Sequence, residues 1–216
     1  MRGVVLASAE FACNRLRREN MSNYWVIIAG YLIGSIPCSY LVGRYWAGID
    51  IRQYGSGNVG MTNVWRNAGR VAGLIALVGD LGKGILGILL ARYFGNDLIV
   101  ALTGIAVLAG HSWPVFLGFK GGKLVATGVG VILAIYPPVG YTAMIIWLAV
   151  TGITRYVSVG SITAVVSIPF LMLTFHLEFP YLILGVFAAV FAVYKHIPNI
   201  KRLLAGKEPN VVFKKR

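Results

Sequence analysis

Long apolar runs constrain the fold of this chain more than any other feature of the sequence. Segments 99–108 and 182–193, for example, contain no charged residue and show no regular alternation of polar and apolar positions. Such runs are typical of helices that face lipid. Of the 216 residues, 57% are hydrophobic and only 12% are charged, whereas a soluble domain carries about 25% charged residues. The sequence therefore predicts an all-α integral membrane protein.

The lengths of the apolar runs predict how often the chain crosses the membrane. A helix needs about 20 apolar residues to cross a bilayer core of about 30 Å. Pro137-Pro138 divides segment 124–154 into halves too short to cross comfortably, so we expect two short helices that form a hairpin around the prolines. We expect about seven transmembrane helices in total, or six if that segment is one kinked span. The full spans are expected at about 24–45, 71–94, 98–117, 157–178 and 181–195.

The basic residues lie mainly between the predicted spans. The chain has 20 Lys+Arg against 7 Asp+Glu, a formal net charge of +13. With residue 24 outside and seven helices, most of the basic residues fall on the inner face, as the positive-inside rule requires. Membrane orientation and anionic ligands therefore explain the charge, and we expect no nucleic-acid partner.

Composition divides the chain into three segments. Residues 1–22 are polar and precede the first span, so we expect an N-terminal extension, from an upstream start, that takes no part in the chemistry. Residues 23–205 are predicted to form a single membrane-embedded domain, and residues 206–216 a basic cytoplasmic tail. Cys13 and Cys38 have neither a zinc-ligand spacing nor a disulfide framework. No motif indicates a metal ion or an organic cofactor.

A glycine-rich segment, 55–66, follows the first predicted span on the inner face. Its glycines permit positive φ angles and a close approach of the main chain to a ligand, and successive N–H groups in such a turn form an anion-binding nest. Its hydroxyl, amide and guanidinium groups are further donors to phosphate. A flexible turn between helices is the alternative interpretation. The candidate ligand-binding residues are Gly55, Ser56, Gly57, Asn58, Gly60, Thr62, Asn63 and Arg66.

A second polar cluster, 110–127, lies at the inner end of the third predicted span. Gly121-Gly122-Lys123 is expected to open the next helix, so that its N–H groups and dipole point at an anion and Lys123 adds a charge. The Gly-x4-Gly-Lys-Ser/Thr spacing of a Walker A loop is absent. A basic loop that only obeys the positive-inside rule is the alternative, and it is the better account of Lys120.

Ionisable groups near or within the predicted spans leave alternatives open. Asp80 and Lys83 are three residues apart on one helix and can pair, yet an ionisable residue in lipid is by default a functional candidate. We therefore keep both structural pairing and ligand contact. His111 is a candidate base, but a hydrogen bond to a neighbouring carbonyl is the favoured interpretation.

Two further polar segments fall on the same inner face. Ser161 lies near the start of the sixth predicted helix, where helix N–H groups are unpaired. The tail places His196, Asn199 and Arg202 directly after the last predicted span.

Taken in order, these segments resemble the bacterial acyl-phosphate:glycerol-3-phosphate acyltransferase family. Each element alone is a weak signal, but seven in order are highly specific, and they cover nearly the whole chain after residue 24. The elements are Gly34-Ser-Ile-Pro37, Gly55-Ser-Gly-Asn-Val-Gly-Met-Thr-Asn-x-x-Arg66, Asp80-x-x-Lys-Gly84, Gly110-His-x-x-Pro-x-Phe116, Phe119-Lys-Gly-Gly-Lys-x-Val-Ala-Thr127, Arg155-Tyr-Val-Ser-x-Gly-Ser161, and His196-x-x-Asn-Ile-x-Arg-Leu203 with Glu208.

The resemblance implies a seven-helix fold in the bacterial cytoplasmic (inner) membrane, with its active site facing the cytoplasm. It implies transfer of a fatty acyl group from acyl phosphate to the sn-1 hydroxyl of glycerol 3-phosphate. The products would be 1-acylglycerol 3-phosphate (lysophosphatidic acid) and phosphate, in phospholipid biosynthesis. Acyl-CoA would not be the donor, and no cofactor is implied. The implied partners are the two substrates and membrane lipid, and we expect a monomer.

The resemblance also assigns site residues. It implies catalytic roles for Ser56, Arg66, Lys123, His196 and Asn199. Substrate or phosphate binding is implied for Gly55, Gly57, Asn58, Gly60, Thr62, Asn63, Gly121, Gly122, Ser161 and Arg202. The sequence departs from the family pattern at Leu124, where the family usually has Gly; a β-carbon there would resist an unusual backbone turn and crowd a phosphate.

The absence of the histidine–aspartate pair used by acyl-CoA-dependent acyltransferases limits the choice of mechanism. No His-x4-Asp pair follows any of the three histidines, so we expect a phosphate oxygen of the donor to accept the hydroxyl proton. A transporter of a phosphorylated metabolite is the main rival function, although the sequence shows no clear inverted repeat. A membrane scaffold would leave the glycine loops unexplained. A metal-dependent phosphatidyl-alcohol transferase ranks last, because the three aspartates, Asp50, Asp80 and Asp97, are widely scattered.

Overall fold

The structure is a computed structural model that describes residues 23–210. All the regular elements in this range are helices. The predicted N-terminal extension 1–22 and residues 211–216 of the tail lie outside the described residues. The α-helices are α2 (Trp25–Ser35), α3 (Cys38–Trp46), α4 (Met61–Ala68), α5 (Arg70–Phe94), α6 (Asp97–Ser112), α7 (Val125–Ile135), α8 (Pro137–Thr154), α9 (Val157–Thr174), α10 (Phe179–Lys195) and α11 (Ile197–Leu204), with short 3-10 turns η1 (Ile51–Gln53) and η2 (Val115–Leu117).

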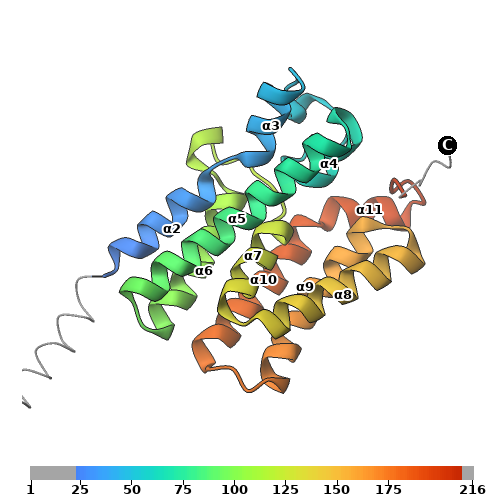
Figure 1. Cartoon of the computed structure of the whole chain (residues 1–216). Helices are drawn as coiled ribbons and strands as arrows, with labels where there is room; N and C mark the ends of the chain where they lie inside the picture. The colour runs from blue at the N-terminus through green and yellow to red at the C-terminus, as the bar shows by residue number, and fades with distance from the viewer. Residues whose placement is uncertain (1–22, 211–216) are drawn as a thin grey trace, which may run out of the picture.

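Helix α5 is the centre of the bundle. It packs against α2, α3, α4, α6 and α7, and Figure 1 shows it between the N-terminal helices and the C-terminal half. From there α6 packs on α10, α10 on α9, and α9 on α8. Val107, Val131 and Leu184, from α6, α7 and α10, are fully buried where these helices meet. The outer faces carry exposed large apolar side chains such as Val78 and Phe179, as expected of helices surrounded by lipid.

The first predicted span is broken in the middle. Helix α2 ends at Ser35, and α3 begins at Cys38 directly after Pro37. Proline has no N–H to continue the helix and disfavours helical geometry in the preceding residue, and Ile36 accordingly has ψ of 116°. The break frees the carbonyl of Ile36, which accepts a hydrogen bond from the buried Lys83 ammonium at 2.8 Å.

The predicted hairpin around Pro137-Pro138 is present. Only Tyr136 separates α7 from α8, and the two helices pack against each other. Pro137 is the first residue of α8, a position where the missing N–H costs nothing because it has no helical partner. Helix α7 has 11 residues, about 16 Å at 1.5 Å per residue, and so is too short to cross a bilayer alone.

The number of spans agrees with the sequence only approximately. Within the described range, five helical segments are long and apolar enough to cross a membrane, or six if α10 and α11, which meet at an angle of 51°, are counted as one broken span. The short α7 accounts for the difference from seven. Figure 1 shows α4 and α11 at the same end of the bundle as the described C-terminus, and this is where the polar segments gather.

Candidate active site

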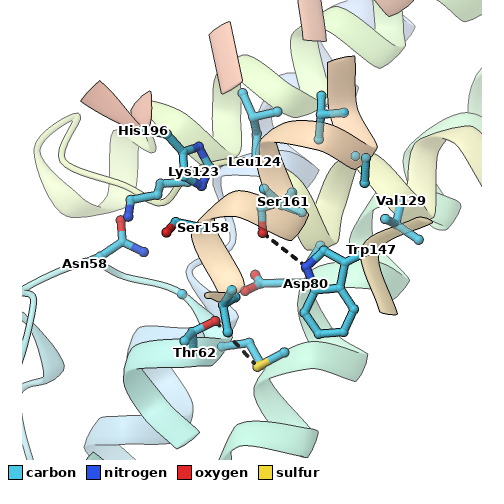
Figure 2. A pocket seen from close by; sticks show the side chains of 18 of the residues that line it. Asn58, Thr62, Asp80, Lys123, Leu124, Val129, Trp147, Ser158, Ser161 and His196 are labelled. Carbon is cyan, nitrogen blue, oxygen red and sulfur yellow. Dashed lines mark hydrogen bonds between the residues drawn. The ribbon is translucent and has the colours of Figure 1, made fainter. Parts of the chain in front are cut away.

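A cavity of about 840 Å³ opens among the polar segments and continues between the helices. Its polar walls come from the loop before α4, from Lys123 and from the chain after α10; its apolar walls come from α7, α8, α9 and α10. Of the residues assigned from the sequence, twelve line it: Gly55, Ser56, Asn58, Gly60, Thr62, Asn63, Arg66, Lys123, Ser161, His196, Asn199 and Arg202. Figure 2 shows Asn58, Thr62, Lys123, Ser161 and His196 around one space.

One face of α9 shows how the cavity changes along its length. Ser158 and Ser161 line it first, and Ala164, Val165 and Ile168 follow. These positions lie three and four residues apart, so they share one face of the helix. Over about 15 Å, at 1.5 Å per residue, the wall passes from hydroxyl groups to hydrocarbon. The cavity therefore suits a molecule with a polar head and an apolar tail.

The loop before α4 is shaped by Asn63. The side-chain amide of Asn63 donates to the carbonyl oxygens of Ile51 at 3.1 Å, Tyr54 at 3.0 Å and Asn58 at 3.1 Å. Its oxygen accepts from the backbone N–H of Ser56 at 3.2 Å. Asn63 thus lines the cavity, but its side chain forms hydrogen bonds with the backbone of the loop. The neutral donors left for a ligand come from its neighbours.

The glycines of this loop behave differently from one another. Gly55 and Gly57 have φ of 57° and 69°, in the left-handed region that favours glycine. Gly60 is extended, with φ of −163°, so the expected positive φ does not apply to it. Gly57 is not among the residues that line the cavity, and its positive φ turns the chain.

The Gly-Gly-Lys segment departs from the prediction that its amides point at an anion. The N–H of Gly121 donates to the carbonyl of Ser112 at 3.3 Å, and that of Gly122 to the carbonyl of His111 at 3.1 Å. A β-carbon on Gly122 would collide with the His111 ring and with the carbonyl of Val59. Gly122 therefore lets the two loops touch, and both glycines face a separate, smaller pocket. Only Lys123 reaches the main cavity.

Leu124 adopts the unusual backbone turn that the family's glycine would favour. Its φ is 58°, in the left-handed region, and α7 starts only at the next residue. The side chain is 1% exposed, lies in the main hydrophobic core and also lines the cavity. Apolar burial thus offsets the backbone strain.

Lys123 is joined to the C-terminal segment. Its ammonium donates to the side-chain oxygen of Asn199 at 2.5 Å. Burial lowers the pKa of Lys123 to about 8, and repulsion from Arg202 acts in the same direction while Glu208 opposes it. Burial likewise lowers the pKa of Arg66 from its ordinary value, with Glu208 opposing and Arg202 reinforcing the effect.

Glu208 organises this cluster of cations. Its carboxylate accepts from Asn199 at 2.6 Å and from Arg202 at 2.8 Å, and the Arg66 guanidinium donates to the carbonyl of the next residue, Pro209, at 3.2 Å. Burial raises the pKa of Glu208, but the hydrogen bonds from Asn199 and Arg202 help to outweigh it and the net shift is downward. Residues beyond 205 therefore contribute to the site.

His196 has a defined tautomer. Its Nδ1 lies 2.7 Å from the carbonyl oxygen of Ala192, and a carbonyl only accepts, so Nδ1 carries the proton. In the neutral imidazole Nε2 is then an acceptor. His196 is buried and lines the cavity, and Figure 2 shows it beside Lys123.

Asp80, Lys83 and His111 form one network inside the bundle. Asp80 pairs with Lys83 at 3.0 Å, accepts from the Ser39 hydroxyl at 2.6 Å, and lies 3.6 Å from His111 Nδ1. The same His111 nitrogen is 3.1 Å from the Thr127 hydroxyl. Asp80 and Lys83 are therefore structurally paired, although Asp80 also reaches the cavity wall. Among residues 23–210, the His111 ring contacts the side chains of Thr127 and Asp80 and not the carbonyl expected from the sequence.

Trp147, Ser158 and Glu208 are among the cavity residues that the sequence assignments missed. Glu208 had a usable signal, since it is one of only 7 acidic residues and stands in a basic tail. Ser158 lies within a recognised polar element. No feature of the sequence indicates that Trp147 lines a cavity, because a tryptophan in an apolar helix is typical of a hydrophobic core or a membrane interface.

Comparison with known proteins shows the family to which this chain is similar. A sequence model of the family described as glycerol-3-phosphate acyltransferase matches residues 24–206. A glycerol-3-phosphate acyltransferase of Desulforamulus reducens is 48% identical over 197 residues, 91% of this chain and 98% of that protein. One of Desulforudis audaxviator is 48% identical over 190 residues, 88% of this chain and 96% of that protein.

A solved structure shows the same fold. The crystal structure of PlsY (YgiH), an integral membrane glycerol 3-phosphate acyltransferase, in its glycerol 3-phosphate form matches with a TM-score of 0.83 and 38% identity, over 86% of this chain and 94% of that chain. Its lysophosphatidic acid form matches with a TM-score of 0.81. The fold and these relatives thus define a multi-span integral membrane acyltransferase. The chain belongs to the glycerol-3-phosphate acyltransferase family.

Proposed function

We propose that the chain transfers a fatty acyl group from acyl phosphate to the sn-1 hydroxyl of glycerol 3-phosphate. The products are 1-acylglycerol 3-phosphate and inorganic phosphate. The observation that carries this proposal is the single cavity with cations at one end and hydrocarbon at the other. Both substrates carry phosphate and one carries an acyl chain, so this cavity suits the pair.

The reaction needs charge neutralisation and alignment more than a strong nucleophile. The glycerol oxygen attacks the acyl carbon, a C–O bond forms, and the bond from that carbon to the phosphate oxygen breaks. Arg66 and Lys123 would neutralise the phosphates, with Ser56 and Ser161 as further donors. Asn199 would hold Lys123 in place through their hydrogen bond. A phosphate oxygen of the donor would accept the hydroxyl proton.

The site is proposed to face the cytoplasm of a bacterial cell, at the inner leaflet of its cytoplasmic membrane. The positive-inside rule supports this side, because Arg66, Lys123 and Arg202 all lie at the end of the bundle that holds α4 and α11. A monomer is proposed to suffice, because twelve of the site residues predicted from the sequence meet in one cavity within a single chain. We place the catalytic unit in residues 23–205 together with the start of the tail.

The proposal is tested by phosphate release from purified protein in detergent. Palmitoyl phosphate would be supplied with and without glycerol 3-phosphate, and palmitoyl-CoA would replace it in a parallel reaction. We expect release that requires glycerol 3-phosphate, yields acylglycerol phosphate, and collapses in Arg66→Ala. Transfer from palmitoyl-CoA but not from palmitoyl phosphate would contradict the proposed donor. Uptake of glycerol 3-phosphate into proteoliposomes without acyl transfer would instead indicate a transporter.

A further inference from the structure

A hydrogen bond joins α8 to α9 at the wall of the cavity. The indole N–H of Trp147 donates to the hydroxyl oxygen of Ser161 at 3.1 Å. Both residues line the cavity, and Ser161 is 4% exposed. Figure 2 shows the bond, with the two side chains reaching toward each other from neighbouring helices.

Close packing of the two helices sets this contact. A β-carbon on Gly160 would collide with the Thr151 hydroxyl and would lie 2.9 Å from the carbonyl oxygen of Trp147. Glycine at 160 therefore lets the backbone of α9 approach α8 at the level of the indole. The distance between Trp147 and Ser161 is thus determined by the bundle and not by a mobile loop.

The chemistry of the two groups fixes the direction of the hydroxyl proton. An indole N–H only donates, so the Ser161 oxygen must accept. Within residues 23–210 the Ser161 hydroxyl makes no other hydrogen bond. One lone pair is therefore occupied and the serine proton is left to donate into the cavity.

The position of Trp147 fits a boundary between two environments. Met144 and Leu148 on the same helix line the apolar part of the cavity, whereas Ser158 and Ser161 face the polar part. Tryptophan suits such a place, because it offers a large apolar ring and a single polar donor.

We propose that Trp147 is a positioning residue that holds the Ser161 hydroxyl as a hydrogen-bond donor to a phosphate oxygen of the substrate. This role rests on the proposed function, since it requires a phosphate-bearing substrate beside Ser161. It does not require Trp147 to touch the reacting atoms.

The test is a double-mutant cycle on kcat/KM with the full-length protein in detergent. The variants are Trp147→Phe, Ser161→Ala and the double variant, assayed with palmitoyl phosphate and glycerol 3-phosphate. A hydrogen bond to a charged group contributes enough that Ser161→Ala should lower kcat/KM by about 10- to 100-fold. Trp147→Phe keeps an aromatic ring but loses the donor, and should lower it by about 3- to 10-fold. In the Ser161→Ala background, Trp147→Phe should have no further effect.

Trp25→Phe is the matched control, because Trp25 is half-exposed on α2 and does not line the cavity. It should leave kcat/KM unchanged. If Trp147→Phe also lowers the melting temperature, benzothienylalanine at position 147 removes the N–H while keeping the size of the ring, and should reproduce the kinetic loss alone.

The outcomes separate the two claims. A wild-type protein without acyl transfer would overturn the proposed function, and with it the role of Trp147. An active wild type in which the two single effects multiply in the double variant would overturn the role of Trp147 alone. So would an active Ser161→Ala variant with unchanged kcat/KM.

Discussion

The Lys123 ammonium donates a hydrogen bond to Asn199, which lies 76 residues further along the chain. Asn199 in turn donates to Glu208, so the loop after α6 and the segment after α10 form one unit. Because Lys123 is buried among cations, this unit holds a lysine that titrates near the physiological range.

We expect kcat/KM to fall as the pH rises through about 8, the pKa of Lys123 in the free protein. The folded pKa lies below the ordinary 10.5, so the ammonium needed to bind phosphate is lost earlier than in an exposed lysine. Lys123→Arg should lose activity but move the fall to higher pH, because arginine stays protonated throughout. A pH profile of kcat/KM from pH 7 upward measures this. An unchanged midpoint in Lys123→Arg would assign the titration to another group.

His196→Ala should retain turnover within about 10-fold of wild type at saturating substrate, because the proton is expected to pass to the donor's own phosphate. The Nε2 of His196 is available as an acceptor, so the experiment discriminates between His196 and the donor's phosphate as acceptors of the hydroxyl proton. Single-turnover transfer of labelled palmitoyl phosphate reports the chemical step directly. A loss of about 10³-fold or more would show that His196 is a general base.

Asp80→Asn should destabilise the protein strongly. It leaves the ammonium of Lys83, 6% exposed, buried without its ion-pair partner, and breaking a buried pair from one side costs about 3–5 kcal/mol. The free energy of unfolding in detergent is the measure. Replacing both residues, in Asp80→Leu/Lys83→Met, should cost less than Asp80→Asn alone.

The matched control for that prediction is Asp50→Asn, which breaks the exposed pair with Arg52, 2.6 Å long. Water screens this pair, so we expect little change in stability. Equal effects at Asp80 and Asp50 would mean that burial does not set the importance of the Asp80 network.

Leu124→Ala should be less stable than Leu124→Gly. Both variants lose a buried leucine side chain, at about 2–5 kcal/mol, but alanine keeps the strain of a left-handed residue, about 1 kcal/mol or more, which glycine relieves. The free energy of unfolding of the two variants gives the comparison. The opposite order would show that Leu124 is unstrained.

Acyl transfer by Leu124→Gly, measured well below its melting temperature, should persist, since Lys123 keeps its bond to Asn199. Loss of transfer there, with the fold intact, would mean that the leucine side chain itself shapes the substrate site.

Long apolar runs and composition predicted the helical membrane fold, and the paired prolines predicted the hairpin at Pro137-Pro138, because both depend on local properties of the chain. Polar residues in an apolar protein likewise predicted most of the polar residues that line the cavity, from Ser56 to Arg202. The sequence could not show that the N–H groups of Gly121 and Gly122 donate to carbonyls of the chain instead of pointing at an anion. Their direction depends on where the carbonyls of Ser112 and His111 lie after α6 packs.

The partners of Trp147 and Glu208 were not predictable for a related reason. A tryptophan among apolar residues becomes informative only when α9 places Ser161 against it. A single glutamate in a basic tail becomes part of the site only when Asn199 and Arg202 converge on it. Contacts between segments far apart in sequence decide both roles.

The placement of Glu208 and Pro209 has a consequence for biosynthesis. Helix α4, which carries Arg66, leaves the ribosome well over a hundred residues before these two, so the cavity stays incomplete during most of translation and membrane insertion. Until residue 208 has been synthesised, the cations of the cavity lack the Glu208 carboxylate. A chain that stopped after α11 would therefore hold every described helix of the bundle and still lack Glu208 and Pro209 at its cavity.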